Sequence, residues 1–379
     1  MKKFATFAAL LLTTSCSGDE GSSSSSSTAV VPGSAVIAPV PTPTPSTTLT
    51  VTVSAAAVST LATFNNGKQA DGAAWFGATG GDGKHDGNGW PGSGDMQSMT
   101  DLGLKTVRVP ILPQYSLNAD GTVNQWVVNH LSDAIKFNMS KGVATVLDAH
   151  TYLPFTDPSV ASFWALFGTT MEKALGGPSP LFGIELSNEP GSSSKDLSAW
   201  TAPLSATIAT IRSAGYQGYI FAGAGDWNNA TFLPAALATI SKPTDMDPLN
   251  RTIYTMHDYW NKDADPGKTR NDQGAAVDGT IDIAKRYDPA LNAARKLGVK
   301  IVMSEIGGGI SPQGPLPAFN GVGKDGKQLE DEYIAYAKAN TDVLLGSWFW
   351  MGGRIGSYRH KVEAGNQHTI ELQQGLWSQ

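Results

Sequence analysis

The stretch FGIELSNEP, residues 182–190, is an apolar run that ends in an amide, a carboxylate and a proline. Runs that are apolar without strict alternation are typical of strands buried on both faces. Pro190 has no N–H to give to a neighbouring strand, so we expect strand pairing to stop there. The sequence therefore predicts a buried strand with Asn188 and Glu189 at its carboxyl end. Glu185 should lie deeper on the same face as Glu189, as a paired structural residue.

Seven similar apolar runs occur elsewhere in the chain, and helix-like segments separate them. The runs are 73–79, 105–111, 142–150, 218–225, 251–259, 299–307 and 343–350. Between them, apolar residues recur at helical spacing, at 128, 131 and 135, at 204, 208 and 211, and at 287, 291 and 294. Eight strands that alternate with helices over roughly 300 residues predict an α/β fold, a single (β/α)8 or TIM barrel.

An open, doubly wound parallel sheet is the alternative fold for such an alternation. That fold places a glycine-rich phosphate-binding loop after its first strand. The segment GATGGDGKHDGNG at 77–89 is glycine-rich, but it contains neither GxGxxG nor GK[ST]. Asp82, Asp86 and Asn88 within it also miss the spacing of a calcium-binding EF-hand loop. We therefore interpret 77–89 as a long loop on the rim of the barrel.

The composition excludes some classes of function. The chain has 379 residues, 41% of them hydrophobic, and a formal net charge of −6. A nucleic-acid partner would require clustered lysine and arginine, which we do not find. Cys16 is the single cysteine, so the fold cannot contain an internal disulfide and must depend on packing. We expect a monomer with no nucleic-acid partner, no metal and no other cofactor.

The first residues predict export. Two lysines precede an apolar stretch over residues 4–12, which is too short to span a bilayer. Small residues then lead to Cys16, as in a bacterial lipoprotein signal, which makes Cys16 the expected lipid attachment site. Ser17 follows it and favours the outer membrane of a Gram-negative cell. The alternative is an ordinary cleaved signal and a secreted protein.

Changes in composition divide the chain into three parts. Residues 1–15 are the expected signal peptide. Residues 16–52 are rich in serine, proline and threonine, which predicts a tether that holds a domain away from a surface. Residues 53–379 contain all eight apolar runs and predict one barrel domain.

Polar and aromatic residues gather at the carboxyl ends of six of the predicted strands. In a (β/α)8 barrel this end carries the functional residues. Burying so many polar groups together without a use would be costly. The candidate site residues are Arg108, Asp148, His150, Asn188, Glu189, His257, Tyr259, Glu305 and Trp350.

Glu189 and Glu305 end strands that face each other across the predicted barrel mouth. Glycoside hydrolysis needs two carboxyl groups that flank the scissile bond. One is protonated and gives its proton to the leaving oxygen, while the other is ionised and attacks or stabilises the anomeric carbon. Arg108 can keep the second group ionised, and Asn188 can hold the sugar 2-hydroxyl. Trp350 offers an apolar floor for a sugar ring.

These residues resemble glycoside hydrolase family five, in the clan with the acid/base after an asparagine on strand 4 and the nucleophile on strand 7. The match runs through VRVP (107–110), LDAHTY (147–152), SNEP (187–190), GDWNNA (225–230), HDYW (257–260), SEIGGG (304–309) and GSWFW (346–350). The run WPGSGDMQSMTDLGLKTVRVP (90–110) and the triple glycine after Glu305 further resemble the subgroup of endo-β-1,4-glucanases.

The resemblance implies a role for each matching residue. Glu189 would be the general acid/base and Glu305 the nucleophile, with Tyr259 hydrogen-bonded to Glu305 and His257 beside both. The −1 sugar site, where the attacked ring binds, would be lined by His150, Asn188 and Trp350. The family retains anomeric configuration, so we expect the two carboxyl groups about 5–5.5 Å apart. The implied substrate is a cellulose-type β-glucan, cleaved without a metal or cofactor.

Other aromatic residues are candidates for outer sugar subsites, because sugars present apolar C–H faces to flat rings. Trp227 and Trp260 are the preferred candidates, ahead of Trp75 and Trp90. Neighbouring Asp226 and Asp258 are expected to stabilise local turns or to support the site residues, and not to be catalysts.

Two alternatives stay open at this point. The first is the same chemistry on another β-glycan: mannan, xyloglucan or mixed-linkage glucan. The second is a non-catalytic glycan-binding lipoprotein. A receptor has no need for Glu189 and Glu305 together with Arg108 and Tyr259, so this combination favours an enzyme.

Overall fold

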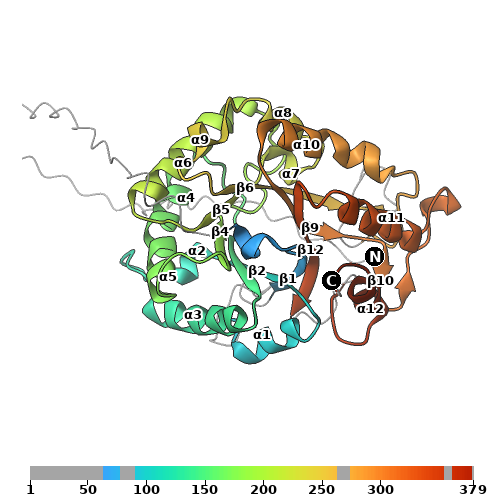
Figure 1. Ribbon diagram of the computed structural model, residues 1–379, viewed down its shortest axis with the longest axis horizontal. Coiled ribbons are helices and arrows are strands. Elements are labelled where there is room, and N and C mark those ends of the chain that lie inside the picture. The colour runs from blue at the N-terminus through green and yellow to red at the C-terminus, as the bar shows by residue number, and fades with distance from the viewer. Residues whose placement is uncertain (1–62, 77–89, 263–273, 354–360, 378–379) are drawn as a thin grey trace, which may run out of the picture. The chain divides into compact units, whose positions relative to one another are not determined.

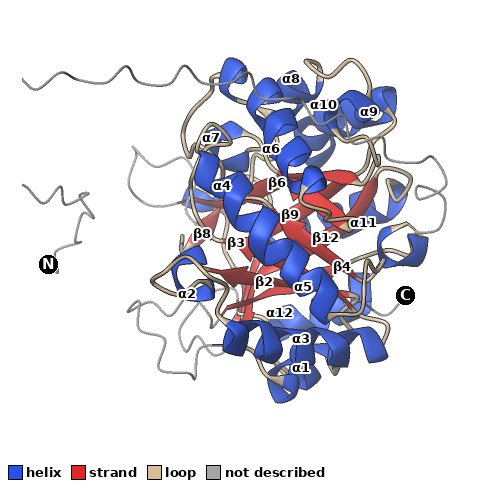
Figure 2. Cartoon of the chain, turned by 90° about the vertical axis from the view of Figure 1, so that its left-hand side faces the viewer, coloured by secondary structure: helices blue, strands red, loops and turns tan. Residues whose placement is uncertain are grey.

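Eight parallel strands close into a barrel, in the order β1-β12-β9-β6-β5-β4-β3-β2. The computed structural model describes residues 63–76, 90–262, 274–353 and 361–377. Each of the eight apolar runs overlaps one barrel strand, and Figures 1 and 2 show the helices outside the strands. The predicted (β/α)8 barrel is therefore confirmed. The expected signal peptide, Cys16, the tether and the rim loop 77–89 lie outside the described residues.

The barrel strands are all parallel, and two antiparallel pairs accompany them. The barrel strands are β1 (Gly72–Phe76), β2 (Thr106–Ile111), β3 (Ala144–Ala149), β4 (Phe182–Glu185), β5 (Tyr219–Ala222), β6 (Thr252–Tyr259), β9 (Ile301–Gly307) and β12 (Leu344–Gly353). The additional pairs are β7 (Asn261–Lys262) with β8 (Ala276–Val277), and β10 (Ile310–Ser311) with β11 (Gly314–Pro315).

Most of the helices fall between successive barrel strands, whereas η2 precedes the first strand and α12 and η6 follow the last. The α-helices are α1 (Ser93–Thr100), α2 (Pro113–Ser116), α3 (Gln125–Ser140), α4 (Pro158–Phe163), α5 (Thr169–Ala174), α6 (Thr201–Ser213), α7 (Gly225–Asn228), α8 (Leu233–Leu237), α9 (Pro243–Met246), α10 (Ile283–Leu297), α11 (Gly326–Ala339) and α12 (Gln367–Leu372). Short 3-10 or π turns are η2 (Phe64–Gly67), η3 (Trp164–Gly168), η4 (Leu197–Ala199), η5 (Phe319–Gly321) and η6 (Gln373–Trp377).

Helix α10 illustrates how the sequence sets an element. Its apolar stripe buries Tyr287, Leu291 and Ala294 against the barrel. The Asp282 side chain accepts a hydrogen bond from Lys285 N at 3.0 Å and so caps the first turn. Gly298 ends the helix in the left-handed conformation, with φ of 78°, which glycine adopts without a Cβ penalty. The stripes predicted in α3 and α6 are buried in the same way.

The barrel interior is apolar at its amino-terminal end and polar at its carboxyl end. Phe64 of η2 packs on Phe221 of β5 with ring centroids 5.0 Å apart, and Phe221 packs on Trp348 of β12 at 5.4 Å. Farther along the strands, the fully buried side chains include Arg108 of β2 and Glu185 of β4. A dry apolar layer thus lies beneath a layer of buried charge, and this second layer supports the site.

Strand β4 ends earlier than we predicted. Its last ladder residue is Glu185, paired with Phe221, so pairing does not continue to Pro190. Glu189 has φ of 46°, outside the extended range, so it does not share a face with Glu185 by simple alternation. The chain turns after Asn188, and this turn rather than a strand delivers Glu189.

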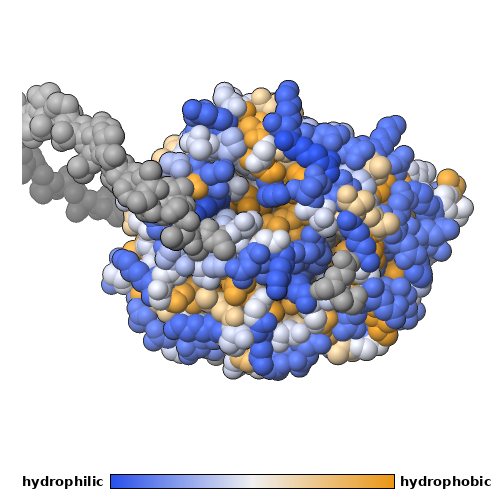
Figure 3. All heavy atoms as spheres, in the orientation of Figure 1, coloured by the Kyte–Doolittle hydropathy of each residue, from blue (hydrophilic) through white to orange (hydrophobic). Residues whose placement is uncertain are grey.

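The described surface is mixed in character. On the face shown in Figure 3, hydrophobic patches are small and interspersed with hydrophilic residues. Within the described ranges, no helix combines the length and the apolar character that crossing a bilayer requires.

Candidate active site

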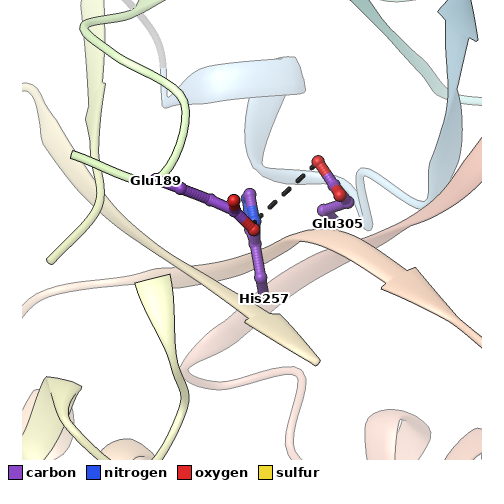
Figure 4. Close-up of side chains that lie close together, drawn as sticks. All are labelled: Glu189, His257 and Glu305. Atoms are coloured by element: carbon purple, nitrogen blue, oxygen red, sulfur yellow. Dashed lines mark hydrogen bonds and ion pairs between the residues drawn. The ribbon is translucent and has the colours of Figure 1, made fainter. Parts of the chain in front are cut away.

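Glu189, His257 and Glu305 meet at the carboxyl end of the barrel, from the β4 loop, β6 and β9 (Figure 4). One side-chain ligand atom from each residue lies within 4.8 Å of the other two. His257 Nδ1 lies 3.1 Å from Glu189 Oε1 and 3.8 Å from Glu305 Oε2. The two glutamates that the sequence singled out are therefore close neighbours, with an imidazole beside both.

Glu189 occupies a constrained backbone position. Asn188 N donates to Ala149 O at 2.9 Å, and Ser187 Oγ donates to Leu153 O at 2.9 Å, which ties this turn to the end of β3. The positive φ of Glu189 is unusual for a residue with a Cβ, and such conformations concentrate at functional sites. The turn holds the carboxyl group in the mouth with its side chain only 13% exposed.

The surroundings of Glu189 favour its protonated form. Burial raises the pKa of the Glu189 carboxyl from 4.5 to about 7, against opposing effects of His150 and Arg108. A carboxyl group with this pKa can hold a proton near neutral pH and can also take one up again.

Glu305 lies in a different electrostatic environment. Arg108 Nη1 donates to Glu305 Oε2 at 3.1 Å, and the Tyr259 hydroxyl donates to Oε1. One donor is a full positive charge and both are aimed at the carboxylate, so they stabilise its negative charge. The two carboxyl groups are thus set apart chemically, as an acid and an anion.

Arg108 connects most of the buried charges of the site. Its Nε donates to Glu185 Oε2 at 2.6 Å, and its Nη2 donates to Asn188 Oδ1 at 2.9 Å and lies 3.0 Å from Asp148 Oδ2. Burial alone would lower the pKa of Arg108, but Asp148, Glu185 and Glu305 raise it above its usual value. The guanidinium therefore stays charged inside the barrel. Glu185 is the paired structural residue that we expected.

The carboxyl spacing discriminates between two hydrolytic mechanisms. The nearest oxygens of Glu189 and Glu305 lie within 4.8 Å of each other. Retaining glycosidases separate their carboxyl groups by about 5–5.5 Å, whereas inverting enzymes leave roughly 6.5–9.5 Å for a water molecule. The observed spacing fits the retaining arrangement.

Asn188, His150 and Trp350 border the two glutamates. Because Asn188 Oδ1 accepts from Arg108, its NH2 group is the end left to donate to a ligand. The His150 ring stacks on Trp350 with centroids 5.3 Å apart and planes at 7°. His150 Nδ1 lies 2.7 Å from Asp148 Oδ2, which fixes the orientation of the ring.

An exposed aromatic pair continues outward from His150. Tyr152 is 49% exposed and Trp227 is 50% exposed, and their centroids are 5.9 Å apart in an edge-to-face arrangement. Tyr152 also lies 6.2 Å from His150. Trp227 therefore has the free surface that a subsite residue needs. We did not select Tyr152 from the sequence, although its place two residues after His150 would have put it on the same rim.

The prediction that Trp260 forms an outer subsite is wrong. Its side chain is fully buried, packs on Tyr333 at 5.3 Å and donates from Nε1 to the Tyr287 hydroxyl at 2.9 Å. Directly after β6, its side chain lies in the core beside helices α10 and α11. The lesser candidates Trp75 and Trp90 are buried as well.

The cluster Glu189, His257 and Glu305 contains atom types that bind metals. However, Arg108 places a full positive charge 3.1 Å from Glu305, which opposes a second cation there. Hydrogen bonds within the protein also engage both carboxyl groups. The arrangement is suited to proton transfer and nucleophilic attack, with no metal required for either step.

A (β/α)8 barrel with an acid and an anion paired at its mouth defines the class of barrel glycoside hydrolases. Residues 67–353 match the family described as Cellulase (glycosyl hydrolase family 5). The chain belongs to this family, and it is a glycoside hydrolase.

Three similar proteins illustrate the relationship. Endo-beta-1,4-glucanase A of Emericella nidulans is 26% identical over 285 residues, which span 72% of this chain and 79% of that protein. The solved structure of an endoglucanase from Pseudomonas stutzeri has a TM-score of 0.63 at 24% identity, covering 83% of this chain and 96% of its own. A mannanase catalytic domain from Streptomyces sp. SirexAA-E has a TM-score of 0.55 at 18% identity, over 82% and 85% of the two chains. The two structures show a shared fold.

Proposed function

We propose that the protein is a retaining endo-β-1,4-glucanase that cleaves cellulose-type glucans by double displacement. The observation that carries the proposal is the pairing of Glu189 and Glu305 within 4.8 Å, in environments that make one an acid and the other an anion. The 26% identity to a protein named as an endo-β-1,4-glucanase supports the choice of glucan.

In the first step, Glu305 attacks the anomeric carbon of the sugar in the −1 site. The bond from that carbon to the glycosidic oxygen breaks, and the Glu189 carboxyl gives its proton to the departing oxygen. Arg108 and Tyr259 orient the Glu305 carboxylate for attack. The product is a glycosyl ester on Glu305 and a Glu189 carboxylate.

In the second step, the Glu189 carboxylate takes a proton from water, and the water oxygen attacks the same anomeric carbon. The ester bond to Glu305 breaks, and both carboxyl groups return to their starting forms. Two displacements at one carbon restore the original anomeric configuration. The NH2 group of Asn188 is placed to donate to the sugar 2-hydroxyl, a contact that strengthens in the transition state.

The test measures reducing-sugar release from carboxymethylcellulose, barley mixed-linkage glucan, xyloglucan and mannan. We expect the highest rate on the glucans with β-1,4 bonds, and a fall of at least ~100-fold in Glu189→Gln and in Glu305→Gln. A higher rate on mannan would show that mannan is the preferred substrate and would leave the proposed reaction unchanged. Unchanged rates in both variants would overturn the assigned roles, and binding without any hydrolysis would revive the receptor alternative.

We also propose that Cys16 carries a lipid that anchors the enzyme in the outer membrane. The support is the sequence itself, in which lysines, an apolar stretch and small residues precede Cys16. Cys16→Ala should release the protein from the membrane fraction into the soluble export fraction. Unchanged membrane association of this variant would contradict the anchor, and a wild-type protein found free outside the cell would favour plain secretion.

A further inference from the structure

A buried line of polar groups runs behind the two catalytic glutamates. Glu185 Oε2 accepts from Arg108 Nε at 2.6 Å, and Glu185 Oε1 accepts from Ser304 Oγ at 3.0 Å. The same Ser304 Oγ lies 3.0 Å from His257 Nε2, and His257 Nδ1 lies 3.1 Å from Glu189 Oε1. Ser304 and Glu185 are fully buried. The line therefore joins the Arg108 charge to the acid/base through one carboxylate, one hydroxyl and one imidazole.

The direction of each hydrogen bond in this line is determined by its first member. Arg108 can only donate, and its ion pair keeps Glu185 an acceptor at both oxygens. Ser304 has one hydroxyl hydrogen and gives it to Glu185. The Ser304 oxygen can then only accept from His257, so Nε2 must carry the imidazole hydrogen.

The remaining imidazole nitrogen faces Glu189. Burial lowers the pKa of His257, since the effect of burial and of Arg108 exceeds the opposing effect of Glu305, Glu185 and Asp148. Burial thus favours the neutral ring, and a neutral ring with its hydrogen on Nε2 has a lone pair on Nδ1. A hydrogen bond between Nδ1 and Glu189 then requires Glu189 to be the donor, which means a protonated carboxyl group.

We propose that Ser304 is a positioning residue that selects the Nε2–H tautomer of His257, so that Nδ1 accepts from Glu189 and holds it in its proton-donating form. This inference rests on the proposed role of Glu189 as general acid. Ser304 and Glu185 would then influence the reaction through His257, without contacting the substrate.

The proposal also explains how the acid recovers its proton. After Glu189 has given its proton away, its carboxylate faces the Nδ1 lone pair at 3.1 Å, which is unfavourable. Of the other charged groups around Glu189, His150 and Arg108 stabilise the carboxylate and Asp148 opposes it. The contact with His257 thus adds to the effect of burial and favours uptake of a proton from the attacking water.

The first test reads the tautomer directly. Nitrogen NMR of protein labelled at its six histidines should show His257 with its hydrogen on Nε2, the signal being assigned by its loss in His257→Asn. Glu185→Gln should reverse the tautomer. Its amide oxygen would face Arg108 and its NH2 would donate to Ser304, so the hydroxyl would turn toward Nε2. Hydrogen on Nδ1 in the wild type would overturn the proposal, whatever the activity of the enzyme.

The second test uses the pH dependence of kcat/KM. Ser304→Ala frees the His257 tautomer, and an Nδ1–H can then donate to the Glu189 carboxylate and favour its ionised form. We expect the alkaline limb of the profile to move to lower pH by about one unit, the size of one charge-assisted hydrogen bond. Ser304→Thr keeps a hydroxyl and should restore the wild-type limb.

The matched control is Ser347→Ala, which removes another fully buried strand hydroxyl, one that bonds to the Tyr333 hydroxyl at 2.7 Å. It should lower stability without moving the limb. An unmoved limb in Ser304→Ala, or an equal shift in Ser347→Ala, would overturn the proposal. A wild-type enzyme without hydrolytic activity would instead contradict the proposed function, while the NMR result would still stand on its own.

Discussion

The guanidinium of Arg108 lies 3.1 Å from Oε2 of Glu305, and the Arg108 side chain is fully buried. A buried charge is tolerated only where partners replace the lost water. Here Asp148, Glu185 and Glu305 replace it, so Glu305, the proposed nucleophile, is one member of a buried charge network.

Replacement of Arg108 should therefore impair both rate and stability. Arg108→Lys keeps the charge but loses the forked geometry, and we expect kcat to fall at least ~100-fold. Arg108→Met leaves buried carboxylates unpaired and should lower the free energy of unfolding by about 3–5 kcal/mol in urea titrations. Arg295→Met, which breaks a partly exposed pair with Asp342, should change it by less than about 1 kcal/mol. Similar losses at both positions would contradict the network.

The rate should decline as pH rises through the pKa of Glu189, about 7. Above this pH the acid is ionised, so kcat/KM on oligosaccharides should fall about tenfold per pH unit. An aryl glycoside with a dinitrophenolate leaving group needs no proton, and its alkaline limb should be absent. If both substrates lose activity in parallel, the limb reports another group.

The raised pKa of Glu189 also affects stability. The folded protein binds this proton up to about pH 7, while the unfolded chain releases it near 4.5. The contribution is complete below pH 4.5 and is lost as pH rises through 7. Glu189→Gln should therefore raise the free energy of unfolding at pH 8 by about 3 kcal/mol and leave it unchanged at pH 4. Glu363→Gln, at a largely exposed carboxylate, should show no such difference.

Trp227 should bind the extended part of the substrate. Trp227→Ala removes an exposed ring beside Tyr152, and we expect about 3–10-fold weaker binding of long cello-oligosaccharides. Hydrolysis of a short aryl glycoside should be unaffected. Trp126 is similarly exposed but stacks on His130 of its own helix, so Trp126→Ala is the control. Calorimetry with cellopentaose measures both, and equal losses would speak against a subsite at Trp227.

Trp260 should act on stability alone. Trp260→Phe removes the donor to the Tyr287 hydroxyl and leaves a cavity, which should cost about 2–3 kcal/mol of unfolding free energy. We expect KM for oligosaccharides to stay within twofold. A large rise in KM without loss of stability would restore Trp260 to the binding surface.

The contrast between these two tryptophans shows where sequence reasoning ends. Both follow barrel strands and lie in motifs of the family, GDWNNA and HDYW. Trp227 lies in a left-handed turn, with φ of 59°. Its backbone amide donates a hydrogen bond to Ser192 O in the neighbouring loop. Trp260 directly follows β6, and its side chain is buried in the core. No local pattern in the sequence distinguishes a ring that faces solvent from one that packs on Tyr333 of α11.

Ser304 illustrates a different limit. A serine in a buried strand has no signal of its own, because its meaning depends on Glu185, 119 residues away, and on His257. Glu185 was predictable as a paired residue, since an ionisable group inside a strand requires a partner. Which partner it has, and which way the hydrogen bonds run, depends on the closure of the barrel.

The sequence by itself determined the barrel and the two glutamates. Buried parallel strands need apolar runs of regular spacing, and the chemistry of a glycosidic bond needs two carboxyl groups, so both leave marks along the chain. Only the tertiary structure decided that Glu189 is an acid and Glu305 an anion. That difference arises from the burial of Glu189 and from the two donors to Glu305, Arg108 and Tyr259, which separate strands bring together across the barrel. Solvation and charge act through space. The order of residues along a chain does not show how far apart those residues lie in the folded protein.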